Sequence, residues 1–168
     1  MKAFFVRNHQ YHFWATEVLY RSLDAFSEDD LKKDMGLFFR SIHGTINHLL
    51  LVEKLWFSRL VGEDFQPKTL SQELQYDPKA LKMELFLAMK RWETWLESQT
   101  EDIWQKVFTY KTMRGFVSRL LYCDLIHHNM NHRTHHRGQI SAAITALGGT
   151  TPEMDYVYFL QQTQYQNE

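Results

Sequence analysis

The chain contains very little cysteine, glycine or proline: one Cys, seven Gly and three Pro in 168 residues. Because Cys123 stands alone, no disulfide can form within the chain, which is typical of a reducing compartment. The N-terminal apolar run is too short for a signal peptide, and no stretch approaches the roughly 20 apolar residues that cross a membrane. We therefore expect a cytoplasmic protein with no membrane partner.

An excess of charge of either sign is also missing. The chain has 19 Lys and Arg against 20 Asp and Glu, and the basic residues are scattered among the acidic ones. A protein that binds nucleic acid usually shows a concentrated basic face, so we expect no nucleic-acid partner. Apolar residues make up 44% of the sequence, which is enough to build the core of one domain over residues 1–168.

The spacing of the apolar residues along the chain is mainly that of α-helices. Scarce Gly and Pro favour long helices, and apolar residues recur at three- and four-residue steps in four segments. Asp77-Pro78 is a strong helix start, while Gly62 and Gly148-Gly149 are typical helix ends. The predicted helices cover residues 2–25, 40–61, 78–98 and 118–147. Their one-sided apolar faces predict an all-α fold, an antiparallel four-helix bundle.

Two segments outside these helices are less regular. Residues 103–117 include the alternating run Val107-Phe108-Thr109-Tyr110, which predicts a short hairpin or an extended loop before the fourth helix. The tail, residues 150–168, contains the aromatic cluster Tyr156-Val157-Tyr158-Phe159. We expect this tail to pack as a strap or as a short helix.

The fourth predicted helix is unusually rich in histidine. Five of the nine histidines lie within ten residues: His127, His128, His132, His135 and His136. Side chains four residues apart lie on one helix face, about 6 Å apart, so His128–His132 and His132–His136 could each bind one metal ion. That face also carries apolar residues and points into the bundle. A metal ion would offset the cost of burying the imidazoles in their neutral form.

A third ligand would have to come from another helix. His48 lies in the middle of the second helix near the edge of its apolar face, and His43 is the rival, which points in a different direction. His9, His12 and His135 are expected to be solvated or hydrogen-bonded.

The motif also excludes two common kinds of metal site. The segment His132-Arg-Thr-His-His136 lacks the glutamate of the metalloprotease motif, and a single Asp124-x-x-His127 pair argues against a di-iron centre. Three neutral imidazoles with an open position suit Zn, Ni or Fe.

Two motifs together resemble a known family. Ser41-Ile-His-Gly-Thr-Ile-Asn-His48-Leu-Leu and Asn131-His132-Arg-Thr-His-His136-Arg-Gly-Gln139 resemble the DinB/YfiT-like superfamily of proposed metalloenzymes, which is unrelated to the polymerase that shares the name. The likeness extends over essentially the whole chain, although His12 stands where relatives often carry Asn. It implies a four-helix bundle, often a homodimer, whose metal ligands are His48, His132 and His136.

The resemblance also implies a function. It suggests a metal-dependent enzyme, a thiol-dependent transferase or a hydrolase, and the three imidazoles favour Zn or Ni over Fe as its divalent metal. The partners would be a small-molecule substrate and a low-molecular-weight thiol. His128, one helical turn before His132, is the candidate catalytic residue, with the alternative that it only holds a ligand ring in place. Glu53 and Asp124 are other groups that could move protons. For Arg137 we expect a surface ion pair rather than a substrate contact. Gln139 is expected to pack the helix or hold a ligand.

The alternative is a non-enzymatic, metal-binding stress-response protein that acts as a sensor or a store. A closed site with a fourth protein ligand would favour that alternative. A site open to an aromatic-lined pocket would favour catalysis.

Overall fold

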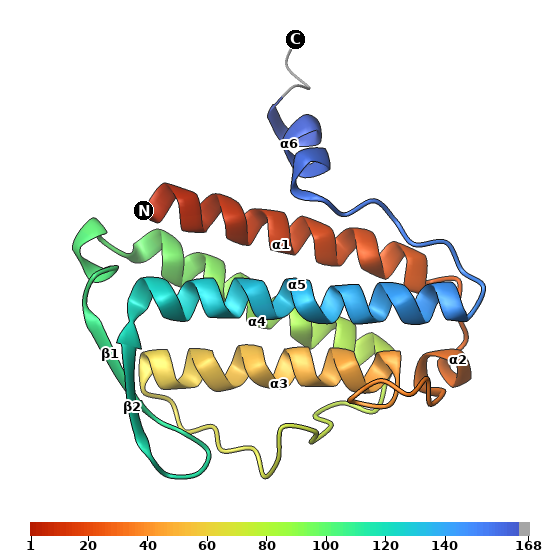
Figure 1. Cartoon of the computed structure of the whole chain (residues 1–168), viewed down its shortest axis with the longest axis horizontal. Helices are drawn as coiled ribbons and strands as arrows, with labels where there is room; N and C mark the ends of the chain where they lie inside the picture. The colour runs from red at the N-terminus through yellow and green to blue at the C-terminus, as the bar shows by residue number, and fades with distance from the viewer. Residues whose placement is uncertain (165–168) are drawn as a thin grey trace.

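Four long helices packed along their lengths form the body of the molecule (Figure 1). The computed structural model describes residues 1–164, and it shows a mostly helical protein with one small two-stranded sheet. The elements in chain order are α1 (Lys2–Leu23), α2 (Glu28–Lys32), α3 (Ile42–Val61), α4 (Pro78–Ser98), a 3-10 turn η1 (Glu101–Ile103), β1 (Val107–Lys111), β2 (Val117–Leu121), α5 (Tyr122–Ala146) and α6 (Tyr156–Gln164).

The four long helices do not alternate in direction, which corrects the prediction of an antiparallel arrangement. In Figure 1, α1 and α5 run one way, and α3 and α4 run the other. The reason is the long connection between α3 and α4, residues 62–77, which crosses the length of the molecule before α4 begins. The antiparallel neighbours α3 and α5 lie side by side at the front and carry the histidines discussed below.

Local capping explains where the central helices begin and end. Ser41 accepts a hydrogen bond from the backbone N–H of Gly44 at the start of α3. Asp77 caps α4 in the same way, with Pro78 at the first helical position, as the sequence predicted. Gly62 ends α3 in the left-handed region, at φ 74°, where a residue with a Cβ would be strained.

The irregular segment before the last long helix is a β-hairpin. Strand β1 pairs antiparallel with β2, from Val107 opposite Leu121 to Lys111 opposite Val117. The hairpin alternative of the sequence analysis is confirmed, and the fold is therefore not purely α-helical. Because β2 continues to Leu121, α5 begins at Tyr122 rather than near residue 118.

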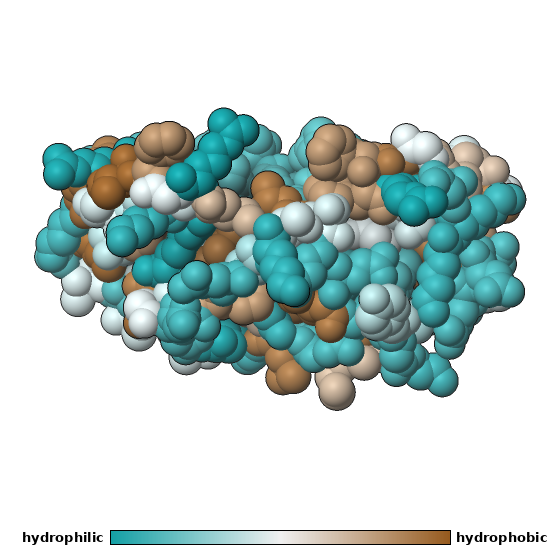
Figure 2. Space-filling view, turned by 90° about the horizontal axis from the view of Figure 1, so that it is seen from below, coloured by the Kyte–Doolittle hydropathy of each residue, from teal (hydrophilic) through white to brown (hydrophobic). Residues whose placement is uncertain are grey.

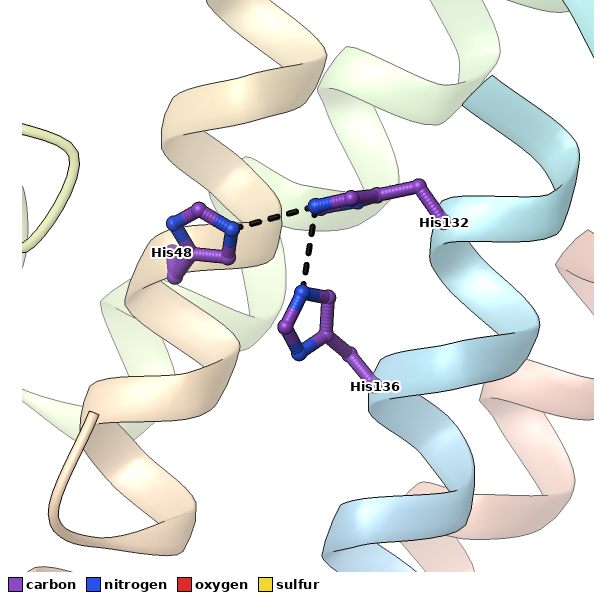
Figure 3. Close-up of side chains that lie close together, drawn as sticks. All are labelled: His48, His132 and His136. Atoms are coloured by element: carbon purple, nitrogen blue, oxygen red, sulfur yellow. Dashed lines mark hydrogen bonds between the residues drawn. The ribbon is translucent and has the colours of Figure 1, made fainter. Parts of the chain in front are cut away.

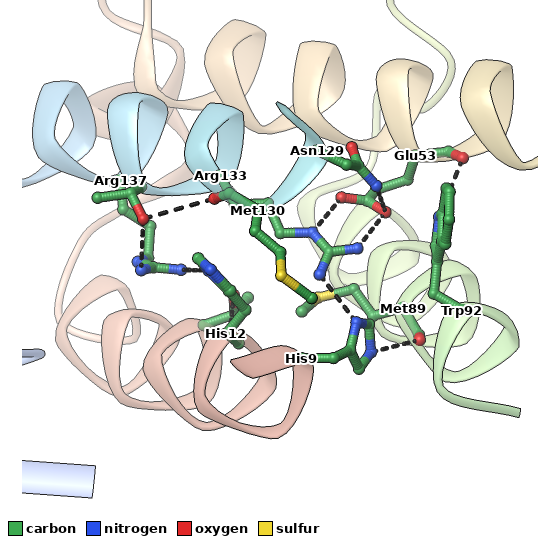
Figure 4. Close-up of polar contacts among 11 residues, drawn as sticks. His9, His12, Glu53, Met89, Trp92, Asn129, Met130, Arg133 and Arg137 are labelled. Atoms are coloured by element: carbon green, nitrogen blue, oxygen red, sulfur yellow. Dashed lines mark hydrogen bonds and ion pairs between the residues drawn. The ribbon is translucent and has the colours of Figure 1, made fainter. Parts of the chain in front are cut away.

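The core has three apolar clusters, and a polar layer separates the two larger ones. One cluster contains Leu50, Met89 and Ile140, and the other, at the hairpin end, contains Trp92 and Trp104. Between them α1, α3 and α5 contribute buried polar side chains: His9, His12, Glu53, Asn129, Arg133, His136 and Arg137. A polar layer of this size must satisfy its own hydrogen bonds, and most of its members do so with one another (Figure 4).

The tail packs on the outside of α1. Helix α6 lies above α1 in Figure 1, and the rings of Tyr156 and Phe159 contact Tyr11. The short-helix alternative is confirmed for this part of the tail; residues 165–168 lie outside the described residues. Among residues 1–164, no helix is both long and apolar enough to cross a membrane.

Candidate metal centre

Three histidine side chains from two helices meet between α3 and α5 (Figure 3). His48 comes from α3, and His132 and His136 come from successive turns of α5. The Nε2 atom of His132 lies 3.1 Å from Nε2 of His48 and 3.1 Å from Nε2 of His136. One nitrogen atom from each of the three rings lies within 4.8 Å of the others, a spacing that could hold a metal ion.

Hydrogen bonds at Nδ1, the ring nitrogen that faces away from the cluster, orient the rings of His48 and His136. Nδ1 of His48 lies 2.8 Å from the carbonyl oxygen of Leu70, in the connection between α3 and α4. Nδ1 of His136 lies 2.7 Å from Oε1 of Gln139. Because these oxygens can only accept, each Nδ1 carries the proton, and each Nε2 presents a lone pair to the centre of the cluster. Such hydrogen bonds orient ligand histidines in metal sites generally.

His132 lies between these two lone pairs and cannot satisfy both. A neutral imidazole has one N–H, so its Nε2 can donate to only one neighbouring ring. Its Nδ1 is buried and has no hydrogen-bond partner among residues 1–164. Whichever ring receives that N–H, at least one Nε2 lone pair at the centre of the cluster is left unmatched. A cation at the centre would accept all three Nε2 lone pairs at once, so the residues fit a metal ion.

The distances fit as well. Ligand nitrogens about 2.0–2.1 Å from a tetrahedral zinc ion are separated by about 3.3 Å. The two Nε2 separations of 3.1 Å lie close to that value before any adjustment of the side chains.

The protonation states also suit a metal. Burial lowers the pKa of His48 to about 4, and burial together with the neighbouring His136 and His48 lowers the pKa of His132 to about 3. Burial also lowers the pKa of His136. All three rings are therefore neutral near pH 7, which is the form that binds metal.

A cavity of about 640 Å³ opens beside the three rings. His48, His132 and His136 lie on its wall, together with the aromatic rings of Phe39 and Trp56. Phe39 stacks on His48 at a centroid distance of 3.8 Å and shields one side of the cluster. Figure 2 shows the face that carries residues 62–77, where the surface is mostly hydrophilic and hydrophobic side chains form separate small groups.

His128 lies in the same cavity but outside the cluster. Its ring is 6.0 Å from the ring of His132 and packs edge-on against Trp56. His43, the rival to His48, lies outside the cluster and bonds the carbonyl oxygen of Gln75 through Nε2. Of the two histidine pairs predicted on this helix, the structure therefore brings His132 and His136 together with His48.

The two carboxylates considered for proton transfer are placed elsewhere. Glu53 is buried in the core and pairs with Arg133. Asp124 is exposed in the first turn of α5. Neither residue lines the cavity beside the histidines.

The predicted surface position of Arg137 is wrong. Instead of a surface ion pair, its side chain is buried, with Nη1 2.8 Å from Nδ1 of His12 and Nη2 donating to the hydroxyl of Tyr11. Apolar periodicity does not predict this position, because a polar layer inside a helical core interrupts the periodic pattern. His9 and His12 are hydrogen-bonded as expected, although both are buried.

Two contributors to the site were not predicted. The Leu70 carbonyl is a backbone group in an irregular loop, and a sequence pattern does not place such a group. Phe39 lies in a short connection before α3, where periodicity carries no information. Gln139 was expected to pack or to hold a ligand, and it accepts the hydrogen bond from His136.

The fold and the site together define a mostly helical protein with a three-histidine cluster of metal-ligand spacing. The sequence model of the DinB family matches residues 1–168, and the chain belongs to that family. It is 22% identical to the protein DinB of Bacillus subtilis (strain 168) over 169 residues, which covers 98% of both chains. The fold is similar to that of a DinB-like protein from Bacillus cereus ATCC 10987, whose crystal structure was determined at 2.01 Å. The TM-score is 0.67 at 17% identity, covering 89% of this chain and 94% of the other.

Proposed function

We propose that His48, His132 and His136 bind one divalent metal ion through their Nε2 atoms. The observation that carries this proposal is the convergence of three neutral imidazoles whose Nε2 atoms have no other set of partners that satisfies them all. Zn or Ni is the preferred ion for three imidazoles, with Fe as a further candidate. In this proposal the long helices serve as a DinB-like bundle that carries the site.

We further propose that the protein is a metal-dependent enzyme acting on a small molecule, of the thiol-dependent transferase or hydrolase type. Among the described residues, the cluster contains no fourth histidine, cysteine or carboxylate, and it borders a cavity large enough for a small substrate. A bound metal of this type supplies Lewis acidity and lowers the pKa of water or a thiol beside it.

The protein's own residues have separate roles in this proposal. The Leu70 carbonyl and Gln139 hold the rings of His48 and His136 in position. Phe39 and Trp56 provide an aromatic wall for the cavity beside the histidines. His128 accepts the proton released in the reaction, because its ring lies on the cavity wall 6.0 Å from that of His132. It is the proposed catalytic residue.

A non-enzymatic metal-binding role in stress response is the second candidate. The same cluster supports it as far as metal binding is concerned. A cavity lined by aromatic rings beside the cluster favours the enzyme over the sensor or store.

Metal analysis of untagged protein tests the first part of the proposal. Mass spectrometry should find up to one divalent metal per chain in the wild type, and most of it should be lost in His48→Ala, His132→Ala and His136→Ala. His127→Ala is the matched control, because His127 is an exposed histidine of α5 that lies outside the cluster. A His48→Ala protein that keeps its metal contradicts the assignment. A thiol-transfer assay with the metal-bound protein then distinguishes a metal-dependent enzyme from a non-enzymatic metal-binding protein.

A further inference from the structure

Arg59 forms part of the cavity wall beyond the histidines. It lies on α3, about three turns and about 16 Å along the helix axis from His48. Its guanidinium carbon is 4.8 Å from the ring centre of Trp56 and 5.2 Å from that of Tyr110. The two rings are themselves in edge-to-face contact, so the guanidinium is held in a fixed aromatic corner.

No anion accompanies this cation. Among residues 1–164, Arg59 forms no ion pair and no side-chain hydrogen bond, although its side chain is half-buried. Arg91 provides the contrast, because it stacks on Phe57 in a similar way but also pairs with Glu63 at 2.5 Å. A planar guanidinium with free N–H groups in a partly desolvated position matches a carboxylate in geometry and charge.

Within the described part of the chain, the wall of the cavity that Arg59 shares with the histidines carries no acidic residue. Its lining contains two arginines, Arg59 and Arg114, and no Asp or Glu. In the adjoining cavity, which also borders Arg59, Glu63 is paired with Arg91, and Asp64 accepts a hydrogen bond from Gln66. In a chain with a net charge of −1, this cavity is thus a local region of positive charge.

Apolar surface connects the two ends of the cavity. Val52, Leu55 and Trp56 lie along α3 between His48 and Arg59, and all three line the cavity. A molecule that reached both ends would be elongated and would lie on apolar side chains in between.

We propose that this cavity binds an elongated organic anion, with a terminal carboxylate on Arg59, an apolar body along α3 and its other end at the histidine cluster. This inference rests on the proposed function, because it names the substrate class of the same site. The carboxylate end nevertheless depends only on Arg59 and the apolar wall, so it is expected to bind in the absence of metal.

The test is calorimetric titration of metal-free protein, prepared by dialysis against EDTA, with phenylbutyrate and with the uncharged phenylbutanol. The wild type should bind the acid about tenfold or more tightly than the alcohol, since a hydrogen-bonded charge pair contributes that much in a partly buried position. Arg59→Gln should remove this preference and leave alcohol binding unchanged within about twofold. Arg59→Lys should keep the charge but lose part of the preference, because an ammonium lacks the planar fork.

The controls separate the possible outcomes. Arg21→Gln, at an exposed arginine of α1 that lines neither cavity, should bind both probes like the wild type. His132→Ala should keep the preference for the acid even though it loses metal, so a failure of the metal proposal can be distinguished from a failure of the anion site. If Arg59→Gln does not melt cooperatively and is therefore not folded, the proposal is tested by the preference for the acid over the alcohol in the wild type and in Arg59→Lys. Equal binding of acid and alcohol by the wild type overturns the proposal, as does a loss of preference in Arg114→Gln but not in Arg59→Gln.

Discussion

Glu53 and Arg133 form a bidentate ion pair in the middle of the core. Nε and Nη2 of Arg133 donate to the two carboxylate oxygens of Glu53 at 2.5 and 2.6 Å, and both side chains are buried (Figure 4). Since Glu53 lies on α3 and Arg133 follows His132 directly on α5, the pair fixes the register of the two helices that carry the histidine cluster. The carboxylate is thus committed to structure rather than to proton transfer.

We expect Glu53→Gln to destabilise the protein by about 3–5 kcal/mol, because Arg133 would remain buried without its counter-charge. Urea unfolding measured by circular dichroism checks this value. The double variant Glu53→Leu/Arg133→Met should recover most of the loss, since it removes both charges together. A loss below about 1 kcal/mol, the size expected of a surface pair, would contradict a buried role for Glu53.

Stability of the metal-free protein should decrease below pH 6.5. Burial, followed by the nearby arginines, lowers the pKa of His9 and of His12 well below the ordinary value of 6.5. In this case the unfolded chain takes up protons that the folded chain does not, so stability is complete above pH 6.5 and is lost as the pH falls toward the lowered values. Urea unfolding at pH 7, 6 and 5 measures the slope of the free energy of unfolding against pH. His12→Gln should make the slope shallower but should not remove it, because burial also lowers the pKa of His9, His48, His132 and His136. A slope equal to that of the wild type would show that His12 does not contribute.

Gln139→Ala should weaken metal binding by about tenfold to a hundredfold, because the hydrogen bond that orients His136 is lost while all three ligands remain. Competition with a chromophoric chelator gives the affinity. Gln10→Ala is the matched control, since Gln10 is exposed on α1 and lies away from the cluster. Equal affinities for the two variants would mean that Gln139 only packs the helix.

His128→Gln should lower turnover in the thiol-transfer assay and leave metal content largely intact. The ring lies in the cavity but 6.0 Å from His132, too far to join the cluster without movement. His127→Gln, on an exposed side of α5, should change neither quantity. Loss of metal in His128→Gln would make His128 a ligand, and unchanged activity would remove its catalytic role.

The histidine pair shows what periodicity alone can predict. His132 and His136 lie on successive turns, so a helix assignment was enough to place them on one face, but the same spacing joins His128 and His132. The choice between these pairs came from the resemblance to the DinB/YfiT-like superfamily, whereas His48 was preferred to His43 because the two point in different directions on their helix. The three-dimensional reason is the meeting of α3 and α5, which helical periodicity does not fix.

The parts that could not be predicted depend on long-range packing. The α3–α4 connection carries few sequence signals, so neither the parallel course of the two helices nor the Leu70 carbonyl beside His48 was foreseen. Arg137 was assigned to the surface because arginine is usually exposed, whereas here His12 and Tyr11 satisfy it inside the core. Helix α4, by contrast, was predicted to the residue because Asp77 and Pro78 fix its start locally.

Anomalous diffraction at the metal absorption edge, from crystals of untagged protein, locates the metal ion and so tests its assignment to the three histidines. We expect one peak per chain about 2.0–2.2 Å from the Nε2 atoms of His48, His132 and His136, with no further protein ligand. A peak bound by His128 and His132, or crystals of metal-supplemented protein with no peak between α3 and α5, would contradict it.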